Sequence, residues 1–248
     1  MRNKKILIPS ILVALLLIFA FFSPYLTPYN VSEQNLMISR QPPSFAHIMG
    51  TDIYGRDMFS RVIAASRISI FSALAVVLLM AITGVVIGIF CGYLSGIADT
   101  VLMRVSDIFL AFPGLVLAIA TAGLFKNGIL GAVIALASVG WPRYARLSRG
   151  LVLSTKTSTY IYAAKLSGSN TVQIVFTQIL PNIIGQIIVT ACLDIGTSLM
   201  ELAALSFLGL GATPPTPEWG SMINERGCEK TRLSFFASPF LQLLCIND

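Results

Sequence analysis

The stretch that decides the fold is residues 68–97, ISIFSALAVVLLMAITGVVIGIFCGYLSGI. It contains no charged residue, and it exceeds the roughly 20 apolar residues that a helix needs to cross a bilayer. Gly84, Gly88, Gly92 and Gly96 recur every four residues, which places them on one face of such a helix. Because small residues let helix backbones approach closely, we expect this face to pack against another membrane helix.

The composition of the whole chain agrees with a membrane location. Of 248 residues, 55% are hydrophobic and 11% are charged, and the mean hydropathy is +0.80. Soluble globular proteins carry about 25% charged residues, so this composition excludes an ordinary soluble enzyme and a disordered chain. The net charge of +6 comes from basic residues spread between apolar runs, which is typical of a polytopic membrane protein and not of a nucleic-acid-binding domain.

Four further apolar runs are proposed as spans: residues 6–23, about 108–125 with Pro113 and Gly114 inside it, 128 to about 140, which is short, and about 182–208. The first run lacks a convincing cleavage site, so we expect it to be retained. Lys126 and Asn127 form the predicted turn between the third and fourth spans. The sequence therefore predicts an all-α polytopic bundle with five clear spans. Residues 233–246 are a doubtful sixth because they are too few.

The distribution of basic residues predicts the orientation. With the N-terminus in the cytoplasm, nine Lys and Arg residues lie in inner segments and five in outer segments before residue 209. An excess of positive charge on the inner side is the usual pattern, so we expect a multi-pass protein of the cell membrane with a cytoplasmic N-terminus.

Two carboxylates fall inside the last predicted span. Asp194 and Glu201 are seven residues apart and so lie on nearly the same helix face. A charge in hydrocarbon costs several kcal/mol, which marks both residues as candidate functional groups of the translocation path. Either they form a buried pair that hydrogen-bonds between helices, or they line a path for a cationic substrate.

Other polar residues do not predict catalysis. Asp52, Arg56, Asp57 and Arg61 alternate in sign, and we expect a surface ion-pair cluster that braces the outer side or meets another protein. The lone histidine, His47, is expected in a surface loop, so neither a metal site nor a hydrolytic triad is predicted. No phosphate-binding loop motif occurs, hence no cofactor is expected, and energy must come from a partner or an ion gradient.

The longest inner polar segment is residues 141–181. Arg143, Arg146 and Arg149 begin it at a spacing of three, and we expect them to snorkel from a helix end. Small residues and a proline follow, and they predict a compact helix–turn–helix with a shallow surface that fits a groove on another protein. The residues concerned are Ala163, Ala164, Gly168, Leu180 and Pro181.

This segment resembles the EAA loop of permease subunits in ATP-binding-cassette (ABC) importers. Tyr162 stands where that family usually has glutamate, and Gln178 where it often has isoleucine. Longer stretches resemble the peptide and nickel group of these permeases: GTDIYGRDMFSRVIAASRISI from Gly50, DIFLAFPGLVLAIA from Asp107 and LSFLGLGATPPTPEWGSMI from Leu205. The resemblance covers nearly all of residues 1–224.

The resemblance implies a non-enzymatic pore subunit in the lipid bilayer. It would pair with a second permease, two ATP-hydrolysing subunits and an extracellular substrate-binding protein, with no nucleic acid involved. Residues 141–181 would dock on the ATP-hydrolysing subunit. Short matches around Asp107, Gly168 and Asp194 are closest to the nickel branch, so nickel or a nickel chelate is the predicted cargo. Dipeptide or oligopeptide import is the alternative, and an ion-gradient-driven secondary transporter is the alternative of another class.

The resemblance also suggests a division of the chain into three parts. Residues 1–67 would hold an N-terminal transmembrane helix and an extracellular loop, residues 68–224 the permease core, and residues 225–248 an atypical tail. Because family character is lost abruptly in the tail, we expect it to be translated in a shifted reading frame. The alternative is a divergent ending that lies along the membrane.

Overall fold

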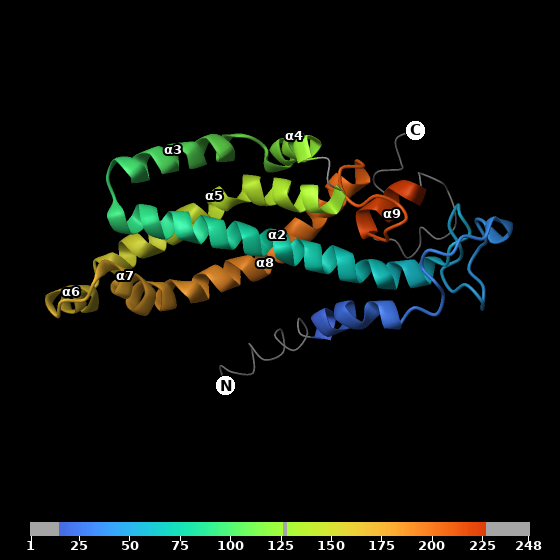
Figure 1. Cartoon of the computed structure of the whole chain (residues 1–248), viewed down its shortest axis with the longest axis horizontal. Helices are drawn as coiled ribbons and strands as arrows, with labels where there is room; N and C mark the ends of the chain where they lie inside the picture. The colour runs from blue at the N-terminus through green and yellow to red at the C-terminus, as the bar shows by residue number, and fades with distance from the viewer. Residues whose placement is uncertain (1–14, 126–127, 227–248) are drawn as a thin grey trace. The chain divides into compact units, whose positions relative to one another are not determined.

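The computed structural model describes residues 15–125 and 128–226, and within these ranges the chain is helical apart from loops and one isolated bridge between Thr51 and Asp57 (Figure 1). The predicted all-α class is therefore confirmed. After an N-terminal apolar helix, Leu15–Tyr25, which ends in η1, the elements follow in this order: η1 (Ser23–Tyr25), η2 (Leu36–Ile38), α2 (Met58–Leu94), α3 (Ile97–Ala111), α4 (Gly114–Phe125), α5 (Gly128–Lys156), α6 (Thr159–Leu166), α7 (Thr171–Ile174), η3 (Val175–Ile179), α8 (Leu180–Phe207) and α9 (Trp219–Arg226).

The number of spans differs from the prediction. Three helices of the described residues are long and apolar enough to cross a membrane, namely Met58–Leu94, Gly128–Lys156 and the continuous helix Thr171–Phe207. A bent pair, α3 with α4, makes a fourth if it counts as one broken span. The prediction of five clear spans is therefore wrong for the described chain. The first predicted span is described only from residue 15, and the predicted turn at 126–127 and the doubtful sixth span lie outside the described residues.

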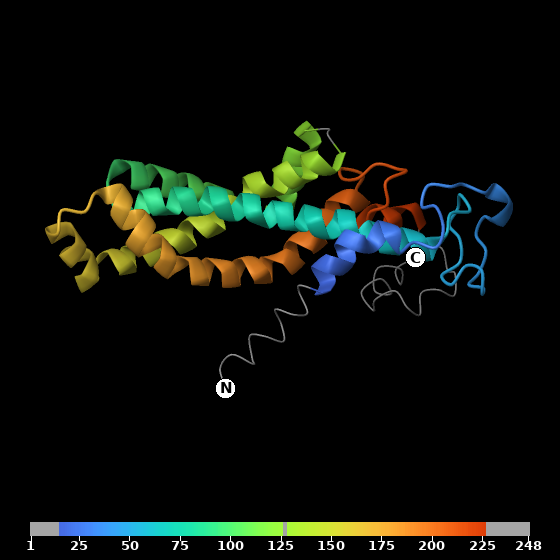
Figure 2. The same ribbon diagram turned by 60° about the horizontal axis from the view of Figure 1, so that its bottom comes forward.

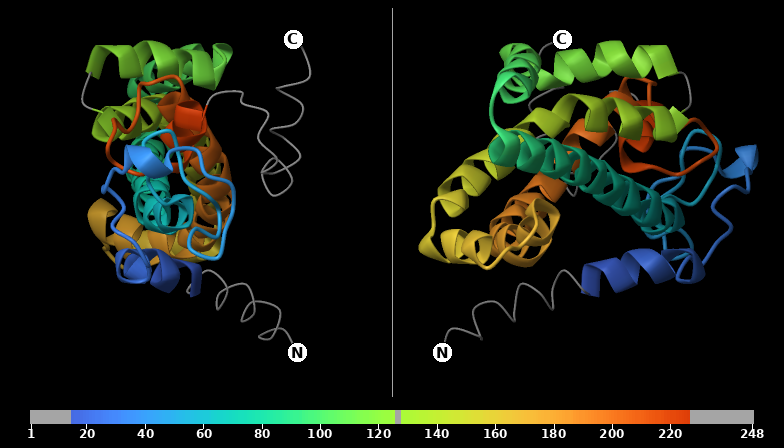
Figure 3. Two further views of the ribbon diagram at one scale, coloured as in Figure 1. Left: turned by 90° about the vertical axis from the view of Figure 1, so that its right-hand side faces the viewer. Right: turned by 60° about the vertical axis from the view of Figure 1, so that its left-hand side comes forward.

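The bend between α3 and α4 lies where Pro113 and Gly114 interrupt the third predicted span. The two helices meet at 98°. Figures 1 and 3 show the change of direction between them. Phe112 ends α3 with φ −93° and ψ 148°. A residue before proline is driven from helical to extended backbone by the proline ring, which explains the break at this point.

The helix α5 is longer than predicted. The apolar run suggested an end near residue 140, but α5 continues through Pro142 to Lys156. Proline is tolerated in membrane helices, because neighbouring groups satisfy the backbone that it leaves unpaired. Residues 141–156 consequently continue the same helix as the apolar run before them, and the helix ends only before Thr157.

Contacts divide the chain into two units: residues 1–70 with 206–248, and residues 71–205. In the first unit, Met58, Ala65 and Met222 are buried together, and Trp219 packs against them. The Trp219 Nε1–H donates to the carbonyl of Val62 at 3.1 Å. This small apolar core joins the start of α2 to α9.

In the second unit, α2 packs on α5 through its glycines. A methyl group at Gly92 would lie 2.8 Å from Cβ of Val152, and one at Gly84 would lie 2.5 Å from Cβ of Tyr144. The predicted close approach at this face is confirmed at both positions. Figure 2 shows α6 and α7 at the far end of this unit, where α5 and α8 are connected.

Candidate functional site

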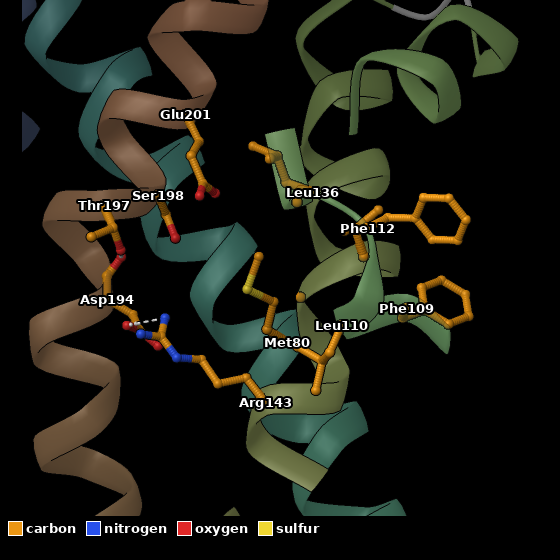
Figure 4. Close-up of a pocket in the computed structure, with 13 residues that line it drawn as sticks. Met80, Phe109, Leu110, Phe112, Leu136, Arg143, Asp194, Thr197, Ser198 and Glu201 are labelled. Atoms are coloured by element: carbon orange, nitrogen blue, oxygen red, sulfur yellow. Dashed lines mark hydrogen bonds and ion pairs between the residues drawn. The ribbon is translucent and has the colours of Figure 1, made fainter. Parts of the chain in front are cut away.

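A cavity of about 340 Å³ lies within the second unit, between α2, the α3–α4 bend, α5 and α8 (Figure 4). Its apolar wall includes Met80 of α2, Phe112 at the bend and Leu136 of α5. Its polar wall is one face of α8, which carries Asp194, Thr197, Ser198 and Glu201. Spacings of three and four residues place these four side chains on one stripe of the helix. The structure thus brings both predicted carboxylates to one cavity.

An ion pair spans the cavity wall between α5 and α8. Arg143 Nη1 donates to Asp194 Oδ1 at 2.8 Å, as the dashed line in Figure 4 shows. The side chain of Asp194 is 7% exposed and that of Arg143 is 63% exposed. Of the two alternatives for Asp194, the interhelical hydrogen-bonded pair is the one that the structure contains. Arg143, which was expected to snorkel, brings a positive charge to the cavity.

Glu201 is placed differently from Asp194. It is half-buried, and its carboxylate points into the cavity from α8 (Figure 4). No cation of residues 15–125 and 128–226 forms an ion pair with it. Among the described residues, the lining therefore carries one carboxylate that forms an ion pair and one that does not.

The other two arginines of α5 bind α3. Arg149 makes a two-pronged pair with Asp99, with Nε–Oδ1 at 2.6 Å and Nη2–Oδ2 at 2.7 Å. Arg146 pairs with Asp107 one turn closer to the cavity. All three arginines are therefore paired, and the expected snorkelling toward the membrane surface stays a prediction. The two aspartates were not predicted as partners, although their spacing of eight residues on one helix matches two turns.

The segment predicted to contact a partner forms the expected helix–turn–helix. Helix α6 contains Ala163 and Ala164, and it ends where Gly168 adopts φ +80°. The Gly168 N–H donates to the carbonyl of Lys165 at 3.0 Å, and the Ser169 N–H donates to that of Ala164 at 3.2 Å. This pair of bonds is the Schellman arrangement, in which glycine is favoured because it has no Cβ.

The two remaining residues of this predicted site lie beyond the turn. Leu180 and Pro181 begin α8, directly after the π-helical stretch Val175–Ile179. Proline lacks an N–H, and its ring crowds the carbonyl four residues earlier, so a locally widened helix accommodates Pro181. Apolar side chains are exposed around the turn, among them Leu166 at 90% and Phe176 at 63%. The surface suits contact with another protein, and nothing in residues 15–125 and 128–226 covers these two side chains.

The alternating charges of the first unit are buried, so the prediction of a surface cluster is wrong. Arg56 and Arg61 are 1% and 0% exposed. Glu225 Oε2 accepts from Nη2 of both, at 2.6 Å and 3.0 Å, and Asp52 Oδ2 accepts from Arg56 Nε at 2.6 Å. We call these four residues the arginine clamp. Glu225 supplies the missing negative charge, and it was not foreseen because it lies more than 160 residues away in the sequence.

Asp57 and His47 complete this part of the first unit. Asp57 Oδ2 accepts from the backbone N–H and the hydroxyl of Ser60, at 2.8 Å and 2.7 Å. His47 Nδ1 lies 2.9 Å from Asp57 Oδ1. The histidine is largely buried at 14% exposure, so it is not the surface residue that we expected.

Comparison with known proteins decides the family. A profile described as "Binding-protein-dependent transport system inner membrane component" matches residues 84–246. The chain belongs to this family. A second profile, "N-terminal TM domain of oligopeptide transport permease C", matches residues 1–43, which include the first predicted span.

The relatives of this binding-protein-dependent permease carry several different cargo names. The dipeptide transport system permease protein of Haemophilus influenzae is 36% identical, covering 90% of this chain and 78% of its own length. The glutathione transport system permease protein of Pectobacterium atrosepticum is 41% identical, covering 91% and 75%. The nickel transport system permease protein of Escherichia coli K12 is 39% identical, covering 87% and 78%.

These findings establish the class of the permease. It is a membrane-embedded permease of an ABC importer in the dipeptide, oligopeptide and nickel group, and it works with other components of such a transporter. Its relatives are transport permeases and not enzymes. The ion-gradient-driven alternative is therefore set aside. The family match runs to residue 246 and therefore includes most of the predicted atypical tail. No finding tests the shifted reading frame, which stays a prediction.

Proposed function

We propose that this permease forms part of the path by which an ABC importer carries short peptides across the cell membrane. The observation that carries the proposal is the charged cavity. Arg143 presents a guanidinium, and Glu201 presents a carboxylate without an ion-pair partner among the described residues. A short peptide has one carboxylate and one ammonium, so a lining with both signs complements it at both ends.

Nickel import is the second candidate. The segments around Asp107, Gly168 and Asp194 favour it, as does the nickel permease at 39% identity. Sequence identity does not distinguish the two cargos. The dipeptide and glutathione permeases are 36% and 41% identical to this chain, on either side of the 39% of the nickel permease. The three charged residues of the cavity sum to one negative charge, which also suits a cation or a cationic chelate. A path that must release its cargo binds it weakly in either case.

The assembly that we propose has four further subunits: a second permease, two ATP-hydrolysing subunits and an extracellular substrate-binding protein. The chain would lie in the inner or plasma membrane with its N-terminus in the cytoplasm. The contact with the ATP-hydrolysing subunit would use the turn around Gly168. Ala163 and Ala164 of α6 and Leu180 and Pro181 of α8 would flank that contact. The exposed apolar side chains there support this assignment.

Competition uptake tests the cargo. Cells or proteoliposomes with the full importer are given a labelled dipeptide, with and without a large excess of unlabelled nickel. We expect uptake that requires ATP and this permease, and that nickel leaves unchanged. Entry of labelled nickel that dipeptide does not reduce would replace the peptide proposal by the nickel one.

A further inference from the structure

We propose that Glu201 selects cargo with a free amino terminus by pairing with its ammonium group. The inference deepens the proposed peptide import and depends on it. It concerns specificity inside the membrane path, beyond whatever selection precedes entry into that path.

The first argument is the position of the carboxylate. Glu201 occupies one end of the polar stripe of α8, and its side chain points into the cavity (Figure 4). It is half-buried, and the described chain offers it no ion-pair partner. A carboxylate within a membrane helix is costly unless a cation or hydrogen-bond donor meets it. A cationic cargo group supplies that partner.

The second argument is that the neighbouring carboxylate is already engaged. Asp194 accepts from Arg143 at 2.8 Å and is almost fully buried. Its charge is cancelled at the wall, so it has little attraction left for a passing cation. Among the residues that line this cavity, Glu201 is the acidic side chain left for an ammonium group.

The third argument is the nature of the opposite wall. Met80 and Leu136 line the cavity with apolar groups that cannot hydrate a charge. A charge pair is stronger beside apolar groups than in bulk water, which makes the presence or absence of one ammonium decisive. Arg143 uses Nη1 for Asp194, and its remaining guanidinium N–H groups are left to donate to the carboxylate end of the same peptide.

The test compares a dipeptide with its N-acetylated form, which lacks the ammonium. Both are presented to the complete importer in proteoliposomes at concentrations that saturate the substrate-binding protein, which is checked by measuring its affinity for each. Saturation removes any selection by that protein. We expect the wild-type importer to favour the free dipeptide. In Glu201→Gln this preference should fall about tenfold, the typical effect of losing one charge-assisted hydrogen bond.

Two further variants make the outcome specific. Glu201→Asp keeps the charge and should retain most of the preference. Thr190→Ala changes α8 outside the cavity lining, and the Thr190 hydroxyl donates to the carbonyl of Gln186 at 3.1 Å, so this variant should transport both peptides as the wild type does. Thermal melting of each purified complex identifies a variant that fails to fold. If Glu201→Gln fails to fold, the preference for the free dipeptide is compared between Glu201→Asp and the wild type.

The possible failures are distinguishable. Equal uptake of both peptides by the wild type, or an unchanged preference in Glu201→Gln, overturns the role of Glu201 and leaves peptide import standing. Absence of any ATP-dependent dipeptide uptake by the wild type overturns both the proposed function and this inference.

Discussion

One methyl group at Gly92 would collide with Val152, and this contact shows how closely α2 and α5 approach. The same argument applies to Gly84, whose Cβ would meet the side chain of Tyr144 and the backbone of Trp141 and Ala145. Gly196 of α8, in contrast, has nothing within 4 Å of its Cβ position. The functional consequence is indirect, since α2 and α5 both line the cavity.

Gly92→Ala should therefore destabilise the permease by about 1–3 kcal/mol, the usual cost of forcing extra atoms into a packed interface. Gly196→Ala is the matched control and should be neutral or slightly stabilising, because alanine favours helix more than glycine. Thermal melting of the purified complex in detergent measures both. Equal melting temperatures for the two variants would show that the α2–α5 contact tolerates the methyl group.

The pairing of Arg149 with Asp99 depends on the shape of the guanidinium as well as its charge. Arg149→Lys keeps the charge but cannot form both parallel bonds to one carboxylate. We expect a loss of about 1 kcal/mol or more in stability, read as a lower melting temperature. Arg104→Lys is the control, because Arg104 is exposed on α3. A loss of the same size at Arg104 would contradict the role given to the paired geometry.

At the scale of elements, the sequence predicted the helices and missed their exact extent. Uncharged apolar residues made α2 predictable, and a mainly apolar run did the same for the last long helix. The bend was not predicted, since Pro113 and Gly114 were expected inside one span. The length of α5 could not be predicted in this way. Pro142 and the three arginines each suggest, when considered alone, that the helix ends near residue 140. Its continuation depends on Asp99, Asp107 and Asp194, and partners on other helices cannot be identified from local pattern.

The turn between α6 and α7 gives an element-scale prediction. Gly168 at φ +80° should resist replacement by a β-branched residue, so Gly168→Val should strain the turn by about 1–3 kcal/mol. The ATP-hydrolysing subunits should then co-purify less with the permease, provided that they bind here as proposed. Gly168→Asn is the matched control, because asparagine tolerates this backbone conformation better. Full co-purification in the valine variant would exclude the turn as the contact.

At the scale of the whole molecule, the sequence predicted the family and singled out the two carboxylates that line the cavity, but not the way charges are paired. Asp194 and Glu201 stood out because charges are rare in apolar runs. The arginine clamp could not be recognised from the sequence, because the burial of Arg56 and Arg61 requires Glu225 from a distant part of the chain. Long-range pairs of this kind become visible only in three dimensions.

Removing the acid from the arginine clamp tests its contribution. Glu225→Gln leaves Arg56 and Arg61 buried with only Asp52 as a carboxylate partner. Breaking a buried ion pair costs about 3–5 kcal/mol, so the melting temperature should fall markedly. Glu33→Gln removes an exposed carboxylate of the same unit and should have little effect. Similar melting of the two variants would mean that the clamp adds no stability.

The arginine clamp also has a consequence for the order of events during synthesis. Glu225 is translated 164 residues after Arg61. At about 5–20 residues per second, ribosomes need roughly 8–33 s to cover that distance. During this interval the two arginines of the nascent chain lack their shared acid. Residues near the start of the described chain can therefore reach their mature arrangement only after residues near its other end have left the ribosome.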